Sequence, residues 1–334
     1  MHMSDALLSP AVGGALWAAT AGVGARCARV VRRDPDDRRI PLMGVLGAFV
    51  FAAQMINFGI PGTGSSGHLG GGMLLAILLG PHAAFLVMAS VLAIQALFFA
   101  DGGLLALGCN VFNLAFFSSF VAYPLVYRPI AGATPTRARV MIGAAVASVL
   151  GLALGSGGVV VETLASGVSS LPPGPFALLV VPVHLAIGLV EGVVTGTIVL
   201  ALWRARPELA GAVHGGASVP RSVLAGVAAA ALVAGGLLSA LASDRPDALE
   251  WSVASVAGAR LPEPPVGGVH ALLGRIQGRT ALLPDYGFDR GAQPGLGGRS
   301  PDMAGTSVSG LVGAVLTLGA SVLTGAGIRR LRRR

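Results

Sequence analysis

The first two residues of the chain, Met1 and His2, carry three nitrogen atoms that can bind one metal ion. Because His2 is not a small residue, methionine aminopeptidase should leave Met1 in place with a free amine. That amine, the His2 amide nitrogen and the His2 ring Nδ1 can close two fused chelate rings. A fourth nitrogen would complete a square. Square-planar nitrogen coordination is typical of Ni(II) or Cu(II), and low-spin Co(II) also accepts it.

The fourth nitrogen is expected from His68, which lies in the glycine-rich stretch Gly64–Gly72. Glycines there allow tight turns and a close approach of the chain, and a histidine at membrane depth indicates a functional site. Taken singly, each histidine has an ordinary interpretation. A histidine at position two is usually an accident, and one in a glycine-rich loop is more often a turn or cap residue.

Several polar residues are candidates for holding these ligands in place. Metal-bound histidines normally donate their second ring N–H to such a group. The candidates are Asp5, Gln54, Asn57, Ser65 and Ser66. Plain hydrogen bonding between helices is the competing interpretation for the amides, and capping of the first helix is the competing one for Asp5.

The composition indicates that a membrane positions these residues. Of 334 residues, 54% are hydrophobic and only 11% are charged, whereas a soluble domain carries roughly 25% charged residues. The 50 glycines fit closely packed membrane helices. The net charge of +8 does not indicate nucleic-acid binding, because the basic residues are all arginines, mostly clustered between apolar stretches, with few aromatic residues. The two cysteines are expected to be packing residues.

About nine apolar segments follow one another, so we expect an all-α polytopic membrane protein. The third segment is too short to span a bilayer and is expected to be a half-length helix buried among the others. The expected segments are 6–31, 40–58, 69–79, 82–100, 104–127, 138–164, 175–203, 222–242 and 308–328.

Arginine positions set the expected orientation. If the nine segments alternate in direction, 17 of the 23 arginines fall on one side, which we assign to the cytoplasm. The remaining six lie in the hydrophilic loop 243–306 beside seven acidic residues. This arrangement places the N-terminus, His68 and that loop outside the cytoplasm.

The opening Met1–Pro10 resembles the "MHIPDGFLSP" start of the CbiM/NikM family, and Ser65–Gly71 resembles its "TSGHLLGG". This family comprises the substrate-binding membrane subunits of cobalt and nickel energy-coupling factor (ECF) transporters. The resemblance covers about residues 1–210 and implies a metal site formed by Met1, His2 and His68. Ser4 and Ala6 stand where the family has proline and glycine.

The second part of the chain resembles the two-span NikN-like partner of that family. Pro246–Glu250 resembles its "PDGLE" motif, with Ala248 in place of glycine, and Pro284–Tyr286 resembles its "PDY" segment. We therefore expect two fused domains: seven segments in residues 1–210 and two in residues 211–334, the latter around the extracytoplasmic loop 243–306.

The chain contains no lysine and so cannot carry a P-loop. The resemblance implies a multi-pass plasma-membrane subunit that is not an enzyme, carries Co²⁺ or Ni²⁺ as substrate, and depends on separate ATPase subunits and a coupling transmembrane (T) subunit. One alternative is an ion-driven metal carrier that uses Glu162 and Glu191. Another is an intramembrane hydrolase with Ser65 or Ser66 and His184 as nucleophile and base.

Overall fold

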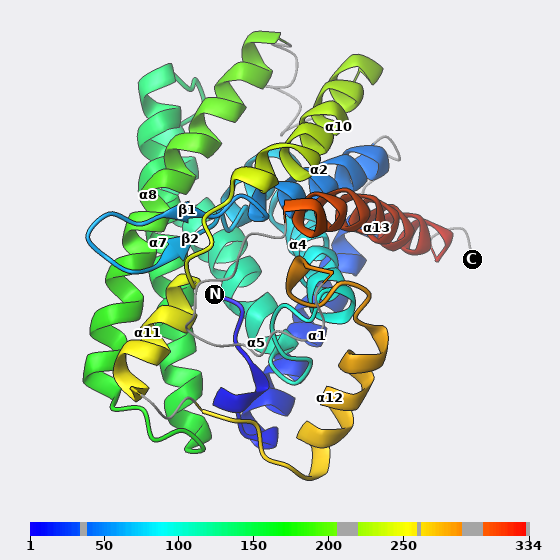
Figure 1. The fold of residues 1–334 in the computed structure, drawn as a ribbon. Coiled ribbons are helices and arrows are strands. Elements are labelled where there is room, and N and C mark those ends of the chain that lie inside the picture. Colours follow the sequence, from blue (N-terminus) through cyan, green and yellow to red (C-terminus); the bar gives the residue numbers. More distant parts are fainter. Residues whose placement is uncertain (34–38, 206–219, 259–261, 289–302, 332–334) are drawn as a thin grey trace.

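The computed structural model describes residues 1–33, 39–205, 220–258, 262–288 and 303–331. Helices dominate this part of the chain, and the N-terminus lies in the interior of the bundle rather than at its edge (Figure 1). The expected boundary between residues 210 and 211 falls outside the described residues, as do Arg38, Arg206 and part of the loop 243–306.

Seven helical segments form the first part of the chain, each close to an apolar segment expected from the sequence. A short turn, η1 (Asp5–Leu7), precedes them. They are α1 (Pro10–Arg33), α2 (Arg39–Gln54), α3 (Gly72–Leu79), α4 (Pro81–Phe98), the continuous run of α5 (Leu107–Val111), η2 (Phe112–Tyr127) and α6 (Arg128–Ala131), α7 (Arg137–Ser166) and α8 (Pro173–Ala205).

The second part contributes two long helices and a set of short ones. The long helices are α10 (Arg221–Gly236), continued by η3 (Leu238–Leu241), and α13 (Met303–Arg330). Between them lie α11 (Ala248–Ala257), α12 (Gly268–Thr280) and the turn η4 (Pro284–Tyr286). The hydrophilic segment that the sequence analysis treated as a loop therefore contains two helices. Asp247 caps α11 by accepting a hydrogen bond from the Glu250 amide at 2.7 Å.

Six helices in the described part are long and apolar enough to cross a membrane. Their bounds are 81–98, 107–131, 137–166, 173–205, 221–241 and 303–330. Helix α2 is apolar but shorter, and α3 has only eight residues, seven of them buried. The prediction of a polytopic all-α protein is confirmed, whereas the count of nine spans stays a prediction.

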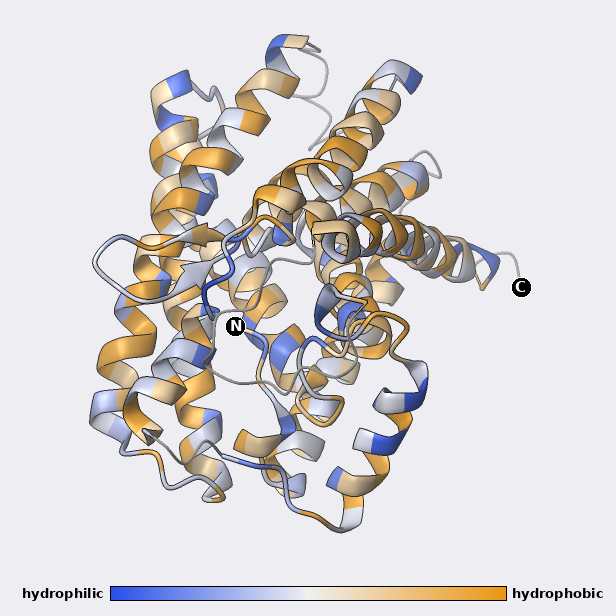
Figure 2. Ribbon diagram, viewed as in Figure 1, coloured by the Kyte–Doolittle hydropathy of each residue, from blue (hydrophilic) through white to orange (hydrophobic). Residues whose placement is uncertain are grey.

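Glycines let the long helices approach closely. A Cβ on Gly188 of α8 would lie 2.7 Å from the Val149 Cα of α7, and one on Gly192 would collide with the backbone at Ala145. Both contacts lie along the α7–α8 interface, so these two helices pack backbone to backbone. Both helices also carry exposed leucines, isoleucine or valines, and their ribbons are coloured largely hydrophobic in Figure 2, as expected for surfaces that face lipid.

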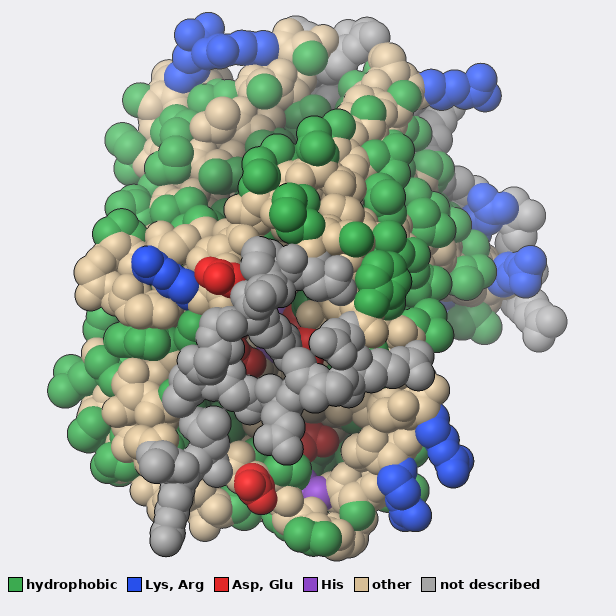
Figure 3. Space-filling view, in the orientation of Figure 1, with side chains coloured by type: hydrophobic (Ala, Val, Ile, Leu, Met, Phe, Trp, Pro, Cys, Tyr) green, Lys and Arg blue, Asp and Glu red, His purple; other side chains and the backbone are tan. Residues whose placement is uncertain are grey.

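The second part is packed into the first rather than standing beside it. Helix α13 packs on α2 and α4, and α10 packs on α2 and α13. A Cβ on Gly44 would lie 2.5 Å from Val322, and Gly313 leaves the space that the Phe51 ring fills. The outer faces of α10 and α13 carry exposed leucines and valines, with basic side chains near helix ends (Figure 3).

The segment between α2 and α3 contains a two-stranded antiparallel hairpin. Strand β1 (Phe58–Gly59) pairs with β2 (Ser66–Gly67), with Phe58 opposite Gly67. Strand β2 lies in the glycine-rich stretch Gly64–Gly72, where the sequence predicts tight turns. His68 directly follows β2, and its ring centroid lies 5.2 Å from that of His2 in the N-terminal segment.

Candidate metal site

Two backbone groups of Met3 are held by one side chain, so the N-terminal segment has a fixed position. The Met3 amide donates to Asn110 Oδ1 at 2.8 Å, and Asn110 Nδ2 donates to the Met3 carbonyl at 3.3 Å. The same carbonyl accepts from the Gly103 amide at 2.9 Å. Asn110 is buried. Its two hydrogen bonds fix the position of the Met3 backbone, and with it the positions of the adjacent Met1 and His2.

The loop after α4 is built to accept this segment. Gly102 has a φ of +79°, and a Cβ there would lie 2.7 Å from Asn110 Nδ2 and 3.4 Å from the His2 Cβ. Glycine is therefore required for both the backbone angle and the close approach. The Asp5 carboxylate accepts from the Ala106 amide at 2.9 Å. Asp5 thus ties the N-terminal segment to the loop and does not cap α1, which begins at Pro10.

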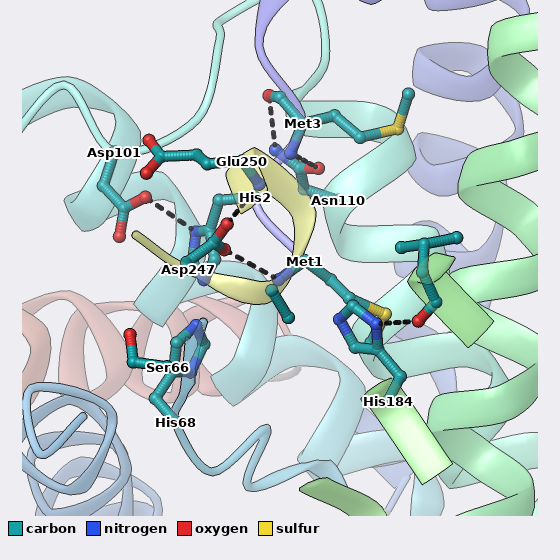
Figure 4. Close-up of polar contacts among 12 residues, drawn as sticks. Met1, His2, Met3, Ser66, His68, Asp101, Asn110, His184, Asp247 and Glu250 are labelled. Atoms are coloured by element: carbon teal, nitrogen blue, oxygen red, sulfur yellow. Dashed lines mark hydrogen bonds and ion pairs between the residues drawn. The ribbon is translucent and has the colours of Figure 1, made fainter. Parts of the chain in front are cut away.

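Met1 is buried, with only 4% of its surface exposed. A Cβ on Gly155 of α7 would lie 3.3 Å from the Met1 sulfur, so the missing side chain leaves room for the thioether. The Met1 amine lies 3.6 Å from Asp247 Oδ2 (Figure 4). The charged amine is therefore inside the protein and is paired with a carboxylate from the second part of the chain.

Ser66 positions the segment that carries Asp247. Its amide donates to the Pro246 carbonyl at 2.8 Å, and its hydroxyl donates to the Arg245 carbonyl at 2.8 Å. A parallel bridge joins Ser66 to Asp247. Asp247 Oδ1 is used in capping α11, which leaves Oδ2 to face the amine. The hairpin and the second part therefore meet at the N-terminus.

His2 lies beside a second carboxylate. Its Nδ1 is 3.3 Å from Asp101 Oδ1, and 5% of the His2 side chain is exposed. The Tyr286 hydroxyl donates to Asp101 Oδ2 at 2.5 Å. The Nε2 atom of His2 has no hydrogen-bond partner among the described residues. Tyr286 belongs to the turn η4, so the PDY-like motif of the second part is linked to His2 through Asp101.

His68 faces the same place from the hairpin. Its ring centroid is 5.2 Å from that of His2, in an edge-on arrangement. His68 Nδ1 donates to the Leu69 carbonyl at 3.0 Å. Because this hydrogen bond places the ring proton on Nδ1, the lone pair lies on Nε2, as a metal ligand requires.

The backbone after His68 is held by two buried side chains. Gln54 Nε2 donates to the Gly70 carbonyl at 2.7 Å, and the Gly70 amide donates to Glu191 Oε2 at 2.7 Å. Gln95 Nε2 in turn donates to Gln54 Oε1 at 2.8 Å. Gln54 therefore supports the loop that carries His68 by binding the backbone carbonyl of Gly70 rather than the His68 ring. Glu191 sits at the N-terminal end of α3, where a carboxylate is favoured.

Three of the residues described above, Met1, His68 and Asp247, line one small cavity. Its volume is about 10 Å³, and its lining includes Met1, His68, His184 and Asp247. A cavity of this size admits about one water-sized sphere. The site therefore suits a single small species rather than an organic molecule.

Burial sets the charge state of the two histidines. Burial, followed by the positive charge of the Met1 amine, lowers the pKa of His2 to about 3. The same two causes, with a smaller contribution from His2, lower the pKa of His68 to about 4. Both rings are neutral near pH 7, and neutral imidazole is the form that binds metals.

The acidic residues respond to the same amine. Burial tends to raise the pKa of Asp247, but the Met1 amine, the Glu250 amide and the histidines lower it overall. Burial raises the pKa of Asp101 despite the Tyr286 hydrogen bond. Burial and the charges of Asp247 and Asp101 raise the pKa of Glu250 to about 7. Asp247 is therefore the carboxylate most firmly kept ionised.

The remaining expected residues lie farther from the rings. Ser65 Oγ pairs with Thr63 Oγ1 at 2.8 Å within the hairpin. Asn57 accepts from the Ser243 amide at 2.8 Å through its backbone carbonyl, and its side-chain oxygen has no partner in the described part of the chain. Within the described ranges of the chain, no hydrogen bond joins Ser65 or Ser66 to a histidine.

Four residues of the site were missed by the sequence reasoning: Asp101, Asp247, Glu250 and Tyr286. Signals for them existed, because three belong to the PDGLE-like and PDY-like motifs and Asp101 ends an apolar segment. Nothing in the sequence showed that they meet the N-terminus.

The fold defines a multi-pass membrane protein, and the site gathers the rings of two histidines beside its buried N-terminal amine. The chain belongs to the CbiM family: residues 2–209 match the cobalt uptake substrate-specific transmembrane region. Residues 221–330 match the PDGLE domain.

A relative that aligns with nearly the whole chain agrees with both matches. A protein of Archaeoglobus fulgidus that carries the name of a fused nickel transport protein, NikMN, is 34% identical over 322 residues, which is 95% of this chain and 96% of that protein. The fused nickel transport protein NikMN of Rhodobacter capsulatus is 35% identical over 63% of each chain. The crystal structure of a truncated transition metal transporter is 31% identical, with a TM-score of 0.53 over 61% of this chain and 99% of that one.

Proposed function

We propose that the chain captures Co²⁺ or Ni²⁺ on the outer side of the plasma membrane, as the substrate-binding component of an ECF-type importer. The observation that carries this proposal is that Met1, with its buried amine, and His68 line one cavity of about 10 Å³, while the His2 ring lies 5.2 Å from that of His68. The relatives described as cobalt uptake and nickel transport proteins support the choice of metal.

The proposed ligands are the Met1 amine, the His2 amide nitrogen and Nδ1, and His68 Nε2. In the structure the amine faces Asp247 and His2 Nδ1 faces Asp101. Binding of the metal therefore requires both nitrogens to exchange a carboxylate for the metal. One proton leaves the amine and one leaves the amide, while the His2 ring proton moves from Nδ1 to Nε2. The two carboxylates remain close by and offset the positive charge of the bound ion.

The chain requires partners for uphill uptake. Its sequence has no lysine with which to build a P-loop, so we propose that separate ATPase subunits and a coupling T subunit supply the energy, and that the chain is not itself an enzyme. We further propose nine segments with the N-terminus outside, and domains at 1–210 and 211–334. Arginines at the ends of α1, α8, α10 and α13 support this orientation.

Metal binding by the purified chain tests the proposal. The chain carries a C-terminal tag so that the N-terminus stays native, and is dialysed at equilibrium against Ni²⁺, Co²⁺, Cu²⁺ or Zn²⁺. We expect one Ni²⁺ or Co²⁺ per chain. Binding of none of these ions would overturn the proposal.

Uptake in cells tests the energy source. Cells that express the chain with and without ATPase and T subunits are compared for accumulation of radioactive nickel or cobalt. We expect accumulation to depend on the partners. Undiminished uptake without them would instead support the ion-driven carrier. The buried Glu162 and Glu191 already accept hydrogen bonds, from Asn113 and from the Gly70 amide respectively, which fits a structural role for both.

A further inference from the structure

His184 is a third histidine at the cavity, and neither the proposed ligand set nor the family match gives it a role. It lies in α8, and only 2% of its surface is exposed. Its Nδ1 donates to the Val180 carbonyl, one turn earlier in the helix, at 2.7 Å. This bond fixes the ring orientation and places the lone pair on Nε2. The ring is thus prepared in the way that second-sphere hydrogen bonds prepare metal-bound histidines.

The lone pair of His184 faces groups that the site already uses. His184 lines the cavity together with Met1, His68 and Asp247, and its ring lies beside the Met1 side chain (Figure 4). The hydrogen bond to Val180 uses Nδ1, so Nε2 is the ring atom that is left with a lone pair for a cation in the cavity.

The N-terminal chelate and His68 leave space for such a contact. Four nitrogens around a metal occupy one plane and leave positions above and below it. His184 reaches the cavity from α8, an element separate from both the N-terminal segment and the hairpin (Figure 4). A nitrogen from α8 adds a donor without replacing any of the four.

We propose that His184 Nε2 is an axial fifth ligand that favours Co(II) over Ni(II) at this site. The inference rests on the proposed function. Low-spin Ni(II) has two electrons in the orbital that points along the axis and repels an axial donor. Low-spin Co(II) has one electron there and binds one axial donor. His184 therefore stabilises bound cobalt more than bound nickel.

The affinities of His184→Ala for the two metals test this role. Loss of one nitrogen ligand is expected to weaken Co²⁺ binding by at least about tenfold, while Ni²⁺ binding changes by less than about threefold. The matched control is His82→Ala, because His82 packs against Phe120 away from the cavity. Equal effects on the two metals, or no effect, would overturn the proposal.

Electron paramagnetic resonance of the unaltered chain provides a second measurement that does not depend on a variant folding. The unpaired electron of low-spin Co(II) lies along the axis, so an axial ¹⁴N splits each cobalt line into three. Labelling histidines with ¹⁵N should convert the triplet to a doublet, and His184→Ala should remove it. Absence of the splitting in the unaltered chain would refute axial nitrogen coordination.

Asp247 is the competing axial donor, since its carboxylate lines the same cavity. Asp247→Asn retains a side-chain oxygen for the α11 cap and serves as the matched variant. A change in the cobalt-to-nickel preference in this variant but not in His184→Ala would assign the axial position to Asp247 and overturn the inference. A chain that binds neither metal before any substitution would instead contradict the proposed function itself.

Discussion

Adding one residue before Met1 is expected to abolish tight metal binding. The addition converts the Met1 nitrogen from an amine to an amide and moves the new amine by up to about 3.5 Å. Met1 is 4% exposed, its amine is 3.6 Å from Asp247, and the cavity is about 10 Å³. No space is left for another residue unless the Met1–Asp247 contact breaks.

The magnitude follows from the number of ligands. Four-ligand zinc sites in small domains bind with about 10–16 kcal/mol, or roughly 3–4 kcal/mol for each ligand. Loss of one nitrogen therefore corresponds to an affinity about 10²–10³-fold weaker. The extension also leaves the Asp247 carboxylate without its partner, and breaking one side of a buried pair costs up to about 3–5 kcal/mol, less here because Asp247 is 21% exposed.

Isothermal titration of Ni²⁺ and Co²⁺ into purified chain measures the effect. Mass spectrometry verifies the extra residue in one preparation and native Met1 in the other, and both carry the same C-terminal tag. Circular dichroism checks that the helices are retained. An affinity within about threefold of the native chain, with the extension verified, would refute the reasoning that the Met1 amine is a ligand.

Three further outcomes follow from the same geometry. His68→Ala should weaken Ni²⁺ and Co²⁺ binding about 10²-fold while the protein remains in the membrane fraction, which titration and fractionation together measure; unchanged affinity would exclude His68 as a ligand. Asn110→Ala removes both side-chain hydrogen bonds to Met3 and should destabilise the chain by about 1–3 kcal/mol, seen as a lower melting temperature in detergent; an unaltered melting temperature would show that the clamp is dispensable. Because the pKa of His2 is lowered to about 3 and that of His68 to about 4, the unfolded chain binds more protons than the folded chain below the ordinary histidine pKa of about 6.5. Stability of chelator-treated protein should therefore be full above about pH 6.5 and fall as the pH decreases toward 4, and a melting temperature independent of pH over that range would contradict the burial of neutral rings.

Much of the architecture could be predicted because its signals are local. Each apolar segment found in the sequence corresponds to a helix, since the length and hydropathy of a segment decide whether it suits the bilayer. The short segment before Gly80 is a buried eight-residue helix, as its length indicated. The segment 243–306 was predicted to be a loop, because its helices α11 and α12 are short and are separated by a stretch that contains prolines and glycines.

The candidate ligands were also local. Met1 and His2 are neighbours, so their chelate chemistry follows from covalent structure alone, and His68 stands out by its glycine-rich surroundings. The supporting contacts were harder to assign. Gln54 and Asp5 act through backbone groups of Gly70 and Ala106, which a list of residue types does not reveal.

The sequence by itself determined that the protein lies in a membrane, that its fold is all-α, and that Met1 and His2 offer adjacent nitrogen atoms. Composition, hydropathy and the order of neighbouring residues are properties of the chain alone. Only the tertiary structure decided what surrounds that N-terminus. Asp247 lies 3.6 Å from the Met1 amine although 246 positions of the 334-residue chain separate them, and His184 joins the cavity through helix packing. Such pairings arise from α10 and α13 packing on α2 and from α7 packing on α8, and no local pattern encodes them.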